Sequence, residues 1–230
     1  MTAQPRSIRS FVVRAGRITD AQRRALDELW PSYGVDFAPE PLDLDALYGR
    51  RAARCVEIGF GNGAHLAALA AAHPERDHLG IEVHPPGVGR LLLCLAEAGL
   101  GNVRVISHDA VEVFEAQLPP ASIDEVQILF PDPWPKKRHH KRRLMQPAFV
   151  ARIADTLRPG GRLTIATDWR PYADHMLEVL GACAALENLA PRGAFAEAPA
   201  DRAPTRFEQR GTRLGHAVSE LAYRKVCAAV

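Results

Sequence analysis

Short apolar runs alternate with longer helix-forming segments through most of the chain. Such runs, bounded by Gly, Pro, Asp or Asn, are typical of buried strands. We expect strands over 55–58, 77–83, 103–107, 123–130 and 162–167. Helices are expected over 65–72, 91–99, 111–118, 147–157 and 172–186, and a turn at Pro159-Gly160-Gly161. Because strands and helices alternate, the pattern predicts an α/β fold whose parallel sheet is built by right-handed crossovers.

The two ends of the chain follow a different pattern. Residues 1–18 lack periodicity and form a basic arm with Arg6, Arg9, Arg14 and Arg17. Thr19-Asp20 indicates a helix start, Pro31 the end of that helix, and 31–50 a loop rich in Pro, Gly and Asp. After a loop at 191–204, the segment 216–226 could be a strand closing the sheet. We therefore divide the chain into an arm and helix (1–50) and one globular domain (51–230).

Composition narrows the class of protein but not its partners. The 230 residues suffice for one domain, and a net charge of +2 points to no particular ligand. No pair of cysteines has the CxxC spacing of a zinc site, so no metal is expected and a reducing compartment is favoured. The basic N-terminus is not followed by an apolar signal segment, and no stretch is long enough to span a membrane. We expect a cytoplasmic protein.

A glycine-rich segment, Glu57-Ile58-Gly59-Phe60-Gly61-Asn62-Gly63, lies between the first expected strand and helix. Glycine permits the tight turn and the close approach of the backbone to a ligand that such a position requires. The spacing Gly59-x-Gly61-x-x-Ala64 also fits a dinucleotide-binding loop. The glycines alone therefore do not identify the cofactor.

Acidic residues recur at or just after the ends of the five expected strands: Glu57, Glu82, Asp109, Asp132 and Asp168. Each alone is explained as a loop residue, but five together indicate a ligand, since clustered carboxylates repel one another. Glu82 is placed to accept from ribose hydroxyls, Asp109 from an adenine amino group, and Glu57 to hold an ammonium. Gly63, Asp109 and the carboxylate before Gly59 favour S-adenosylmethionine over NAD, because an extra carboxylate is unfavourable beside a pyrophosphate.

The segment Phe130-Pro131-Asp132-Pro133-Trp134-Pro135 follows the fourth expected strand. Three prolines make it stiff, and it offers a carboxylate and an aromatic ring that can clamp a flat heterocycle. Inward packing of Trp134 is as reasonable as stacking on a base.

A basic run follows directly, from Lys136 to Arg143, in which six of eight residues are Lys or Arg. Most runs of charged residues are solvated surfaces. This run directly follows the expected active-site loop, which favours a phosphate backbone as its partner. His139 and His140 fit this basic patch better than a metal site, because no third ligand is apparent. Further along the chain, Thr205 and Glu208 are candidates for hydrogen bonds to substrate, whereas core packing also explains Phe207.

Taken together, the motifs resemble the bacterial tRNA (guanine-N7-)-methyltransferase family. The segments that carry the resemblance are Ile8-Arg9-Ser10-Phe11, Glu57-Ile58-Gly59-Phe60-Gly61, Gly80-Ile81-Glu82-Val83-His84, 130–139, Thr167-Asp168-Trp169 and 205–211. They span nearly the whole chain in order, and the Pro-Asp-Pro-Trp-Pro-Lys-Lys stretch is the most specific. One position departs from the pattern, because Ser219 stands where an aromatic residue is expected.

The resemblance implies a Rossmann-like class I S-adenosylmethionine-dependent methyltransferase fold, with a mostly parallel seven-stranded sheet flanked by helices. It implies methyl transfer to N7 of guanosine 46 in the tRNA variable loop, by a monomer or homodimer, with Asp132 as the catalytic residue. The implied cofactor-binding residues are Glu57, Gly59, Gly61, Glu82, Asp109 and Asp132. The implied substrate-binding residues are Lys136, Asp168, Thr205, Arg206, Phe207 and Glu208. The implied RNA-binding residues are Arg138, His139, His140, Lys141, Arg142 and Arg143.

Two other classes of protein remain open at this point. One is a methyltransferase that modifies an exocyclic base amine or a protein side-chain amide, whose Asp/Asn-Pro-Pro-aromatic loop is close to Asp132-Pro133-Trp134. The other is a non-catalytic RNA-binding protein that keeps the fold. The complete acidic set argues against the second class, because an inactive copy has no need to retain those carboxylates.

Overall fold

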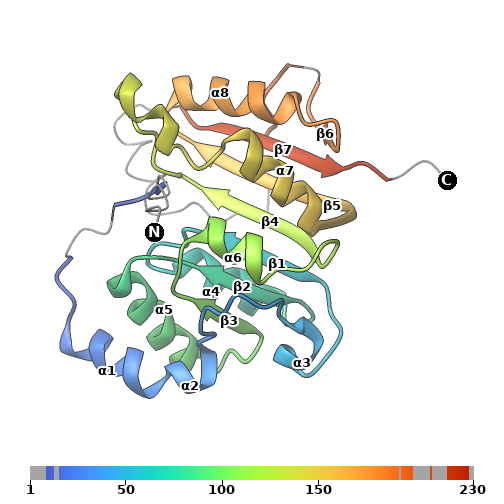
Figure 1. Cartoon of the computed structure of the whole chain (residues 1–230). Helices are drawn as coiled ribbons and strands as arrows, with labels where there is room; N and C mark the ends of the chain where they lie inside the picture. The colour runs from blue at the N-terminus through green and yellow to red at the C-terminus, as the bar shows by residue number, and fades with distance from the viewer. Residues whose placement is uncertain (1–8, 13–15, 192, 199–207, 209–216, 228–230) are drawn as a thin grey trace, which may run out of the picture.

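The computed structural model describes residues 9–12, 16–191, 193–198, 208 and 217–227. In this part of the chain, seven strands form one sheet in the order β3-β2-β1-β4-β5-β7-β6 (Figure 1). The strands are β1 Arg54–Ile58, β2 Asp77–Ile81, β3 Val103–Ile106, β4 Ile123–Leu129, β5 Leu157–Thr167, β6 Leu186–Asn188 and β7 Ser219–Lys225. Strands β1 to β5 are parallel, and β7 runs antiparallel to β5 and β6. The predicted α/β class with a mostly parallel seven-stranded sheet is confirmed.

Helices pack on both faces of the sheet and bury two apolar clusters (Figure 1). The longer helices are α4 Ala64–Ala72, α5 Pro85–Ala98, α6 Ala110–Ala116, α7 Pro147–Thr156 and α8 Arg170–Gly181. Val56 and Ile58 of β1 belong to the same cluster as α6, α7 and α8. Because side chains alternate along a strand, Glu57 points to the opposite face, which α4 covers. This alternation decides which helix can reach Glu57.

The start of β5 is irregular. Ile123 pairs with Leu157, whereas Glu125, only two residues further along β4, pairs with Arg162. The extra residues of β5 form a bulge at Pro159-Gly160-Gly161, where Gly160 has a φ of +81°. The expected turn at these residues is therefore part of the strand, since both of its ends pair with β4.

The C-terminal segment is inserted into the sheet rather than added at its edge. The expected strand is confirmed as β7, which lies between β5 and β6. Ser219 is its first residue and pairs with Thr167 at the end of β5. The edge strand β6 is not apparent from the sequence, because three residues are too few for an alternating pattern. Its presence means that α8 ends at Gly181, earlier than expected.

The N-terminal region contains more helix than the sequence indicates. Helix α1 (Asp20–Glu28) begins as expected, with Thr19 and Gln22 forming a capping box. Pro31 does not end this helix but lies in the first turn of the short helix α2 (Trp30–Tyr33), and α3 (Leu44–Tyr48) lies within the expected loop. The Gln22 side chain donates to Pro86 O at 3.0 Å, so α1 is tied to α5. The boundary between residues 50 and 51 stays a prediction.

Three further features bear on the class of protein. All four cysteines are free thiols. Within the described ranges, no helix is long and apolar enough to cross a membrane. Among those same residues, no group of three or more His, Cys, Asp or Glu side chains could hold a metal ion.

Candidate active site

The five acidic residues singled out by sequence lie at one edge of the sheet. Glu57 is the penultimate residue of β1, and the other four follow the ends of their strands: Glu82 after β2, Asp109 after β3, Asp132 after β4 and Asp168 after β5. These strands are parallel neighbours, so their carboxyl ends meet at the same edge. The structure therefore brings together the carboxylates that the sequence separates by more than a hundred residues.

The loop between β1 and α4, residues 59–63, is called the glycine loop below. Gly59, Gly61 and Gly63 have φ values of +73°, +59° and +74°, which side chains with a Cβ rarely adopt. Gly63 is also the N-cap of α4, and a Cβ on it would lie 2.6 Å from Leu91 Cβ. Glycine is thus required at these positions by backbone conformation, and at Gly63 by packing as well.

Glu82 braces the glycine loop. Its Oε2 accepts from Gly61 N at 2.9 Å, and its Oε1 accepts from the backbone N–H groups of Val83 and His84 at 2.7 and 3.0 Å. Burial raises the pKa of the Glu82 carboxyl, and these three N–H donors act in the opposite direction. Backbone donors thus fix the carboxylate at the end of β2 in one orientation.

Asp109 serves as the N-cap of α6. One carboxylate oxygen accepts from Val111 N at 3.0 Å, and the residue is 9% exposed. Burial raises the pKa of the Asp109 carboxyl. The preceding residue, His108, stacks on Phe37 with ring centroids 3.8 Å apart and an interplanar angle of 10°. The end of β3 is therefore followed by a histidine that stacks on Phe37 and, at the next position, by a carboxylate fixed by a backbone N–H.

The loop after β4, residues 130–135, is called the Pro-Asp-Pro-Trp loop. Phe130 and Trp134 have positive φ values of +54° and +45°, an unusual conformation for bulky residues. Asp132 lies between them and is exposed. Such backbone strain persists only where neighbouring contacts enforce it.

Residues 9–12 are called the N-terminal segment, and they make some of the contacts that hold the Pro-Asp-Pro-Trp loop in this conformation. Trp134 donates from Nε1 to Ser10 O at 2.9 Å. Arg142 donates to Arg9 O and Phe11 O, both at 3.2 Å, and its guanidinium lies 4.4 Å from the centre of the Trp134 ring. Trp134 thus binds another part of the same chain and is half-buried rather than packed in the core, and its stacking on a base stays a prediction.

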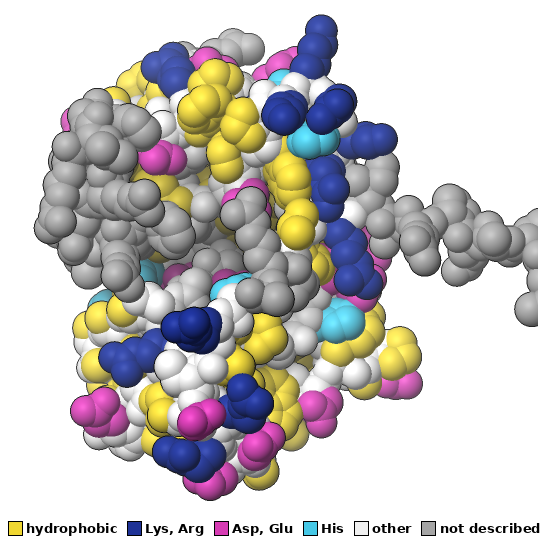
Figure 2. Space-filling view, turned by 90° about the vertical axis from the view of Figure 1, so that its left-hand side faces the viewer, with side chains coloured by type: hydrophobic (Ala, Val, Ile, Leu, Met, Phe, Trp, Pro, Cys, Tyr) yellow, Lys and Arg dark blue, Asp and Glu magenta, His cyan; other side chains and the backbone are white. Residues whose placement is uncertain are grey.

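The basic run divides into two parts. Its 3₁₀ helix, η1 (Lys137–Arg142), carries exposed side chains at Lys137, Arg138 and Lys141. Figure 2, which views the molecule from the left of Figure 1, shows Lys, Arg and His side chains gathered along one margin of this face. Burial and the neighbouring charges of Arg138 and Lys136 lower the pKa of His139.

Arg143 differs from the rest of the basic run. It is only 4% exposed, donates from Nε to Pro133 O at 3.0 Å, and lies 4.8 Å from the centre of the Tyr172 ring. A side chain held in this way is not presented to a phosphate backbone, so its expected RNA contact is not supported here. Arg143 instead stabilises the Pro-Asp-Pro-Trp loop through its hydrogen bond to Pro133 O.

The remaining substrate candidates are placed unevenly. Lys136 is exposed beside η1, and Asp168 is half-buried directly after β5. Glu208 is half-buried. Thr205, Arg206 and Phe207 lie outside the described residues. Only Lys136 and Asp168 can therefore be assigned to the same sheet edge as Asp132.

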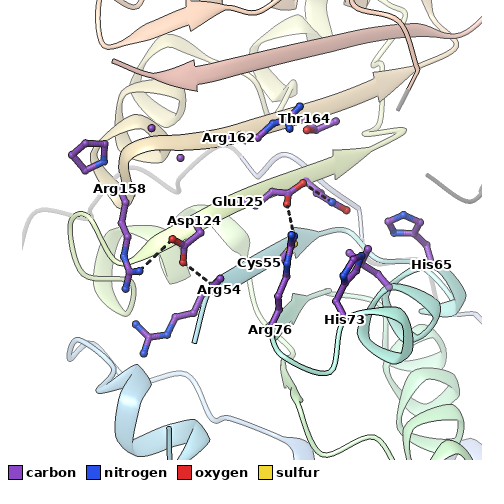
Figure 3. Close-up of a pocket in the computed structure, with 16 residues that line it drawn as sticks. Arg54, Cys55, His65, His73, Arg76, Asp124, Glu125, Arg158, Arg162 and Thr164 are labelled. Atoms are coloured by element: carbon purple, nitrogen blue, oxygen red, sulfur yellow. Dashed lines mark hydrogen bonds and ion pairs between the residues drawn. The ribbon is translucent and has the colours of Figure 1, made fainter. Parts of the chain in front are cut away.

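A cavity of about 480 Å³ lies between α4 and the face formed by β1, β4 and β5 (Figure 3). Its lining carries ion pairs, among them Arg158 with Asp124 and Arg76 with Glu125. None of the predicted site residues lines it. Its connection to the acidic edge is His65, which lines the cavity and lies 2.9 Å through Nδ1 from Glu57 Oε2.

Two contributors to this edge were missed by sequence reasoning. The apolar pattern places His65 only within a helix, although its place eight residues after Glu57, just past the glycines, is a usable signal. Ser10 contributes a backbone carbonyl, for which residue type gives no signal at all.

Comparison with known proteins agrees with this geometry. A family described as "Putative methyltransferase" matches residues 51–221. A tRNA (guanine-N(7)-)-methyltransferase of Leifsonia xyli subsp. xyli is 59% identical over 216 residues, covering 94% of this chain and 95% of the relative. The chain belongs to the tRNA (guanine-N7-)-methyltransferase family. A family member from Halorhodospira halophila is 55% identical and covers 96% of both chains. Membership makes S-adenosylmethionine the methyl donor.

Solved structures support the fold of this family member. The 16S rRNA methyltransferase KamB superposes with a TM-score of 0.56 at 18% identity, covering 94% of this chain and 99% of KamB. An S-adenosylmethionine-dependent O-methyltransferase from Thermotoga maritima gives a TM-score of 0.52 at 17% identity, covering 90% of this chain and 72% of the other. At these identities the likeness concerns the fold, and it confirms the class I methyltransferase architecture.

Proposed function

We propose that this protein transfers a methyl group from S-adenosylmethionine to N7 of guanine in tRNA, at guanosine 46 of the variable loop, giving 7-methylguanosine. The observation that carries the proposal is the position of Asp132. It lies on a strained loop between the carboxylates of β1 to β3 and an exposed basic surface. That order suits a cofactor on one side of the reacting base and an RNA backbone on the other.

The residues present fit the cofactor. At Gly59, Gly61 and Gly63 the glycine loop offers backbone without side chains, and it lies so close to α5 that a Cβ on Gly87 would be 2.1 Å from Gly61 O. Glu82 would accept from the two ribose hydroxyls, Asp109 from the adenine amino group, and Glu57 from the methionine ammonium. Gly59 and Gly61 would allow close approach of the loop, and Asp132 would border the site. This set of acceptors matches the ribose hydroxyls, adenine amino group and ammonium group of a nucleoside that carries an amino acid.

For this methyl transfer, the protein needs to position the two substrates and to stabilise charge. When bound, the cofactor supplies a methyl group on a sulfonium. Guanine N7 has a lone pair and no proton to lose, so no strong general base is required. The base becomes cationic on methylation, and a fixed carboxylate at Asp132 stabilises that charge while accepting from the guanine edge. The rigidity of the Pro-Asp-Pro-Trp loop supports this role, because an electrostatic group acts best when it need not reorganise.

For substrate binding we propose Lys136, Asp168 and the stretch Thr205, Arg206, Phe207 and Glu208. For the RNA backbone we propose the basic run with its histidines, led by the exposed Arg138 and Lys141, together with His139, His140 and Arg142. The contacts of Arg142 with the N-terminal segment make it the weakest of these candidates. We further propose that the enzyme acts in the cytoplasm, as a monomer or homodimer.

The test is mass spectrometry of nucleosides from an unmodified tRNA transcript incubated with protein and labelled cofactor. We expect a labelled 7-methylguanosine peak, which disappears when position 46 of the transcript is not guanosine. Label in an amine-methylated base instead would overturn the assignment of N7. No label, together with retained tRNA binding, would indicate a non-catalytic protein.

Asp132→Ala tests the catalytic assignment. We expect kcat to fall by about 100-fold or more, because a preorganised charge next to the reacting base is lost. Asp27→Ala, which removes an exposed carboxylate on α1, is the matched control and should keep wild-type turnover. Near-normal turnover of Asp132→Ala in a folded protein would exclude the role.

A further inference from the structure

Glu57 is a buried carboxylate with a histidine partner. Its side chain is 3% exposed, and that of His65, the second residue of α4, is 8% exposed. Glu57 Oε2 and His65 Nδ1 are 2.9 Å apart. A carboxylate so deeply buried needs hydrogen-bond donors, because a polar oxygen left unpaired away from water is costly.

The kind of donor matters for the cofactor. A Lys or Arg at this position would neutralise Glu57 and compete with the methionine ammonium for it. An imidazole whose Nδ1–H donates to Glu57 fixes the direction of the carboxylate oxygens without the cationic chain of Lys or Arg. The pairing is therefore suited to hold a carboxylate that must still attract a cation.

The surroundings allow His65 to act on Glu57 without itself touching the cofactor. His65 lies on α4 and lines the cavity between α4 and the sheet (Figure 3). The glycine loop, by contrast, lies at the carboxyl edge of the sheet. The contact with the site that the structure gives His65 is its pairing with Glu57.

We propose that His65 is a positioning residue that orients the Glu57 carboxylate toward the methionine amino group of S-adenosylmethionine. This inference rests on the cofactor role proposed for Glu57. It predicts a selective effect. Loss of the Nδ1 donor weakens ligands that carry the amino acid part of the cofactor and spares ligands that lack it.

The test compares His65→Phe, which keeps a ring but has no donor, with His65→Asn, whose side-chain amide nitrogen lies near the position of Nδ1. Calorimetry measures binding of S-adenosylmethionine and of 5′-methylthioadenosine, which keeps the adenosine but lacks the amino acid part. For His65→Phe we expect about tenfold weaker binding of S-adenosylmethionine and unchanged binding of 5′-methylthioadenosine, as for loss of a hydrogen bond to a charged group. His65→Asn should stay within about threefold of wild type.

Kinetics and a double mutant complete the test. His65→Phe should raise KM for S-adenosylmethionine and leave kcat at saturating cofactor nearly unchanged. In a Glu57→Gln background the same substitution should have little further effect, because the two residues act as one unit. Equal weakening of both ligands would reveal a merely structural role and overturn the proposal, as would wild-type affinity in His65→Phe. Absence of 7-methylguanosine with the wild-type enzyme would instead overturn the proposed function, whatever these binding ratios are.

Discussion

The glycine loop and the Pro-Asp-Pro-Trp loop lie at the same edge of the sheet and both contain residues with positive φ, but they reach this conformation in different ways. In the glycine loop, Gly59, Gly61 and Gly63 adopt it without steric cost. In the other loop, Trp134 adopts it where Ser10, Arg142 and Arg143 hold the loop in place, and Phe130 where its backbone N–H donates to Ala166 O at 2.8 Å. The first loop depends on residue type, and the second depends on tertiary contacts.

This difference has a functional sense. A loop that must lie close to a cofactor is best made of residues without side chains. A loop that must hold a carboxylate against a reacting base needs rigidity, which distant contacts supply. The cost of that rigidity is that the loop depends on the N-terminal segment, which lies more than 120 residues away in sequence.

The largest effect is expected in the glycine loop. Gly63→Ala should lower the free energy of unfolding by about 3 kcal/mol, since a left-handed residue costs about 1–2 kcal/mol and overpacking against Leu91 a similar amount. Gly59→Ala is the matched control, because its φ is also positive but its Cβ would meet no atom within 4 Å. Denaturant unfolding of the cofactor-free protein measures both. Equal losses would show that backbone strain alone accounts for the glycine at position 63.

An intermediate effect is expected from Trp134→Phe, which keeps the ring but removes its hydrogen bond to Ser10 O. We expect kcat/KM for tRNA to fall about tenfold, while the free energy of unfolding changes by only about 1 kcal/mol, the worth of one hydrogen bond. Asp132 then loses part of its fixed position.

Trp30→Phe is the control for this substitution. It also removes an indole hydrogen bond, to Asp36 Oδ1 at 2.9 Å, but on α2 rather than in the active-site loop. It should leave kcat/KM unchanged. Equal losses of activity in the two variants would mean that the contact with the N-terminal segment does not hold the catalytic loop.

The same contrast explains what sequence could and could not predict. The five parallel strands can be predicted from apolar periodicity. The acidic edge can be predicted because the residue type itself indicates the environment, as a carboxylate does at Glu82 and a glycine at Gly63. The bulge in β5 and the short strand β6 exist because of pairing partners elsewhere in the chain. The positive φ of Phe130 and Trp134 has no local signal for the same reason.

The basic run shows this limit most clearly, because Arg138 and Arg143 are equivalent in sequence but not in structure. One is exposed on η1, and the other is 4% exposed beneath the Pro-Asp-Pro-Trp loop. From charge alone, both arginines are expected to bind RNA. Their burial shows that Arg138 lies on the surface, whereas Arg143 supports the loop.

The smallest expected effect on activity, a change in the salt dependence of tRNA binding, separates these two roles. Arg138→Gln should reduce the slope of log affinity for tRNA against log salt concentration by about 1, as for loss of a single phosphate contact, without changing stability. Arg143→Gln should leave that slope unchanged and lower the free energy of unfolding by about 1–3 kcal/mol, because Pro133 O loses its donor and the Tyr172 ring its cation. Filter binding over a range of salt concentrations, with denaturant unfolding beside it, measures both. If Arg143→Gln changed the salt slope as much as Arg138→Gln, charge rather than burial would determine which residues of the basic run bind RNA.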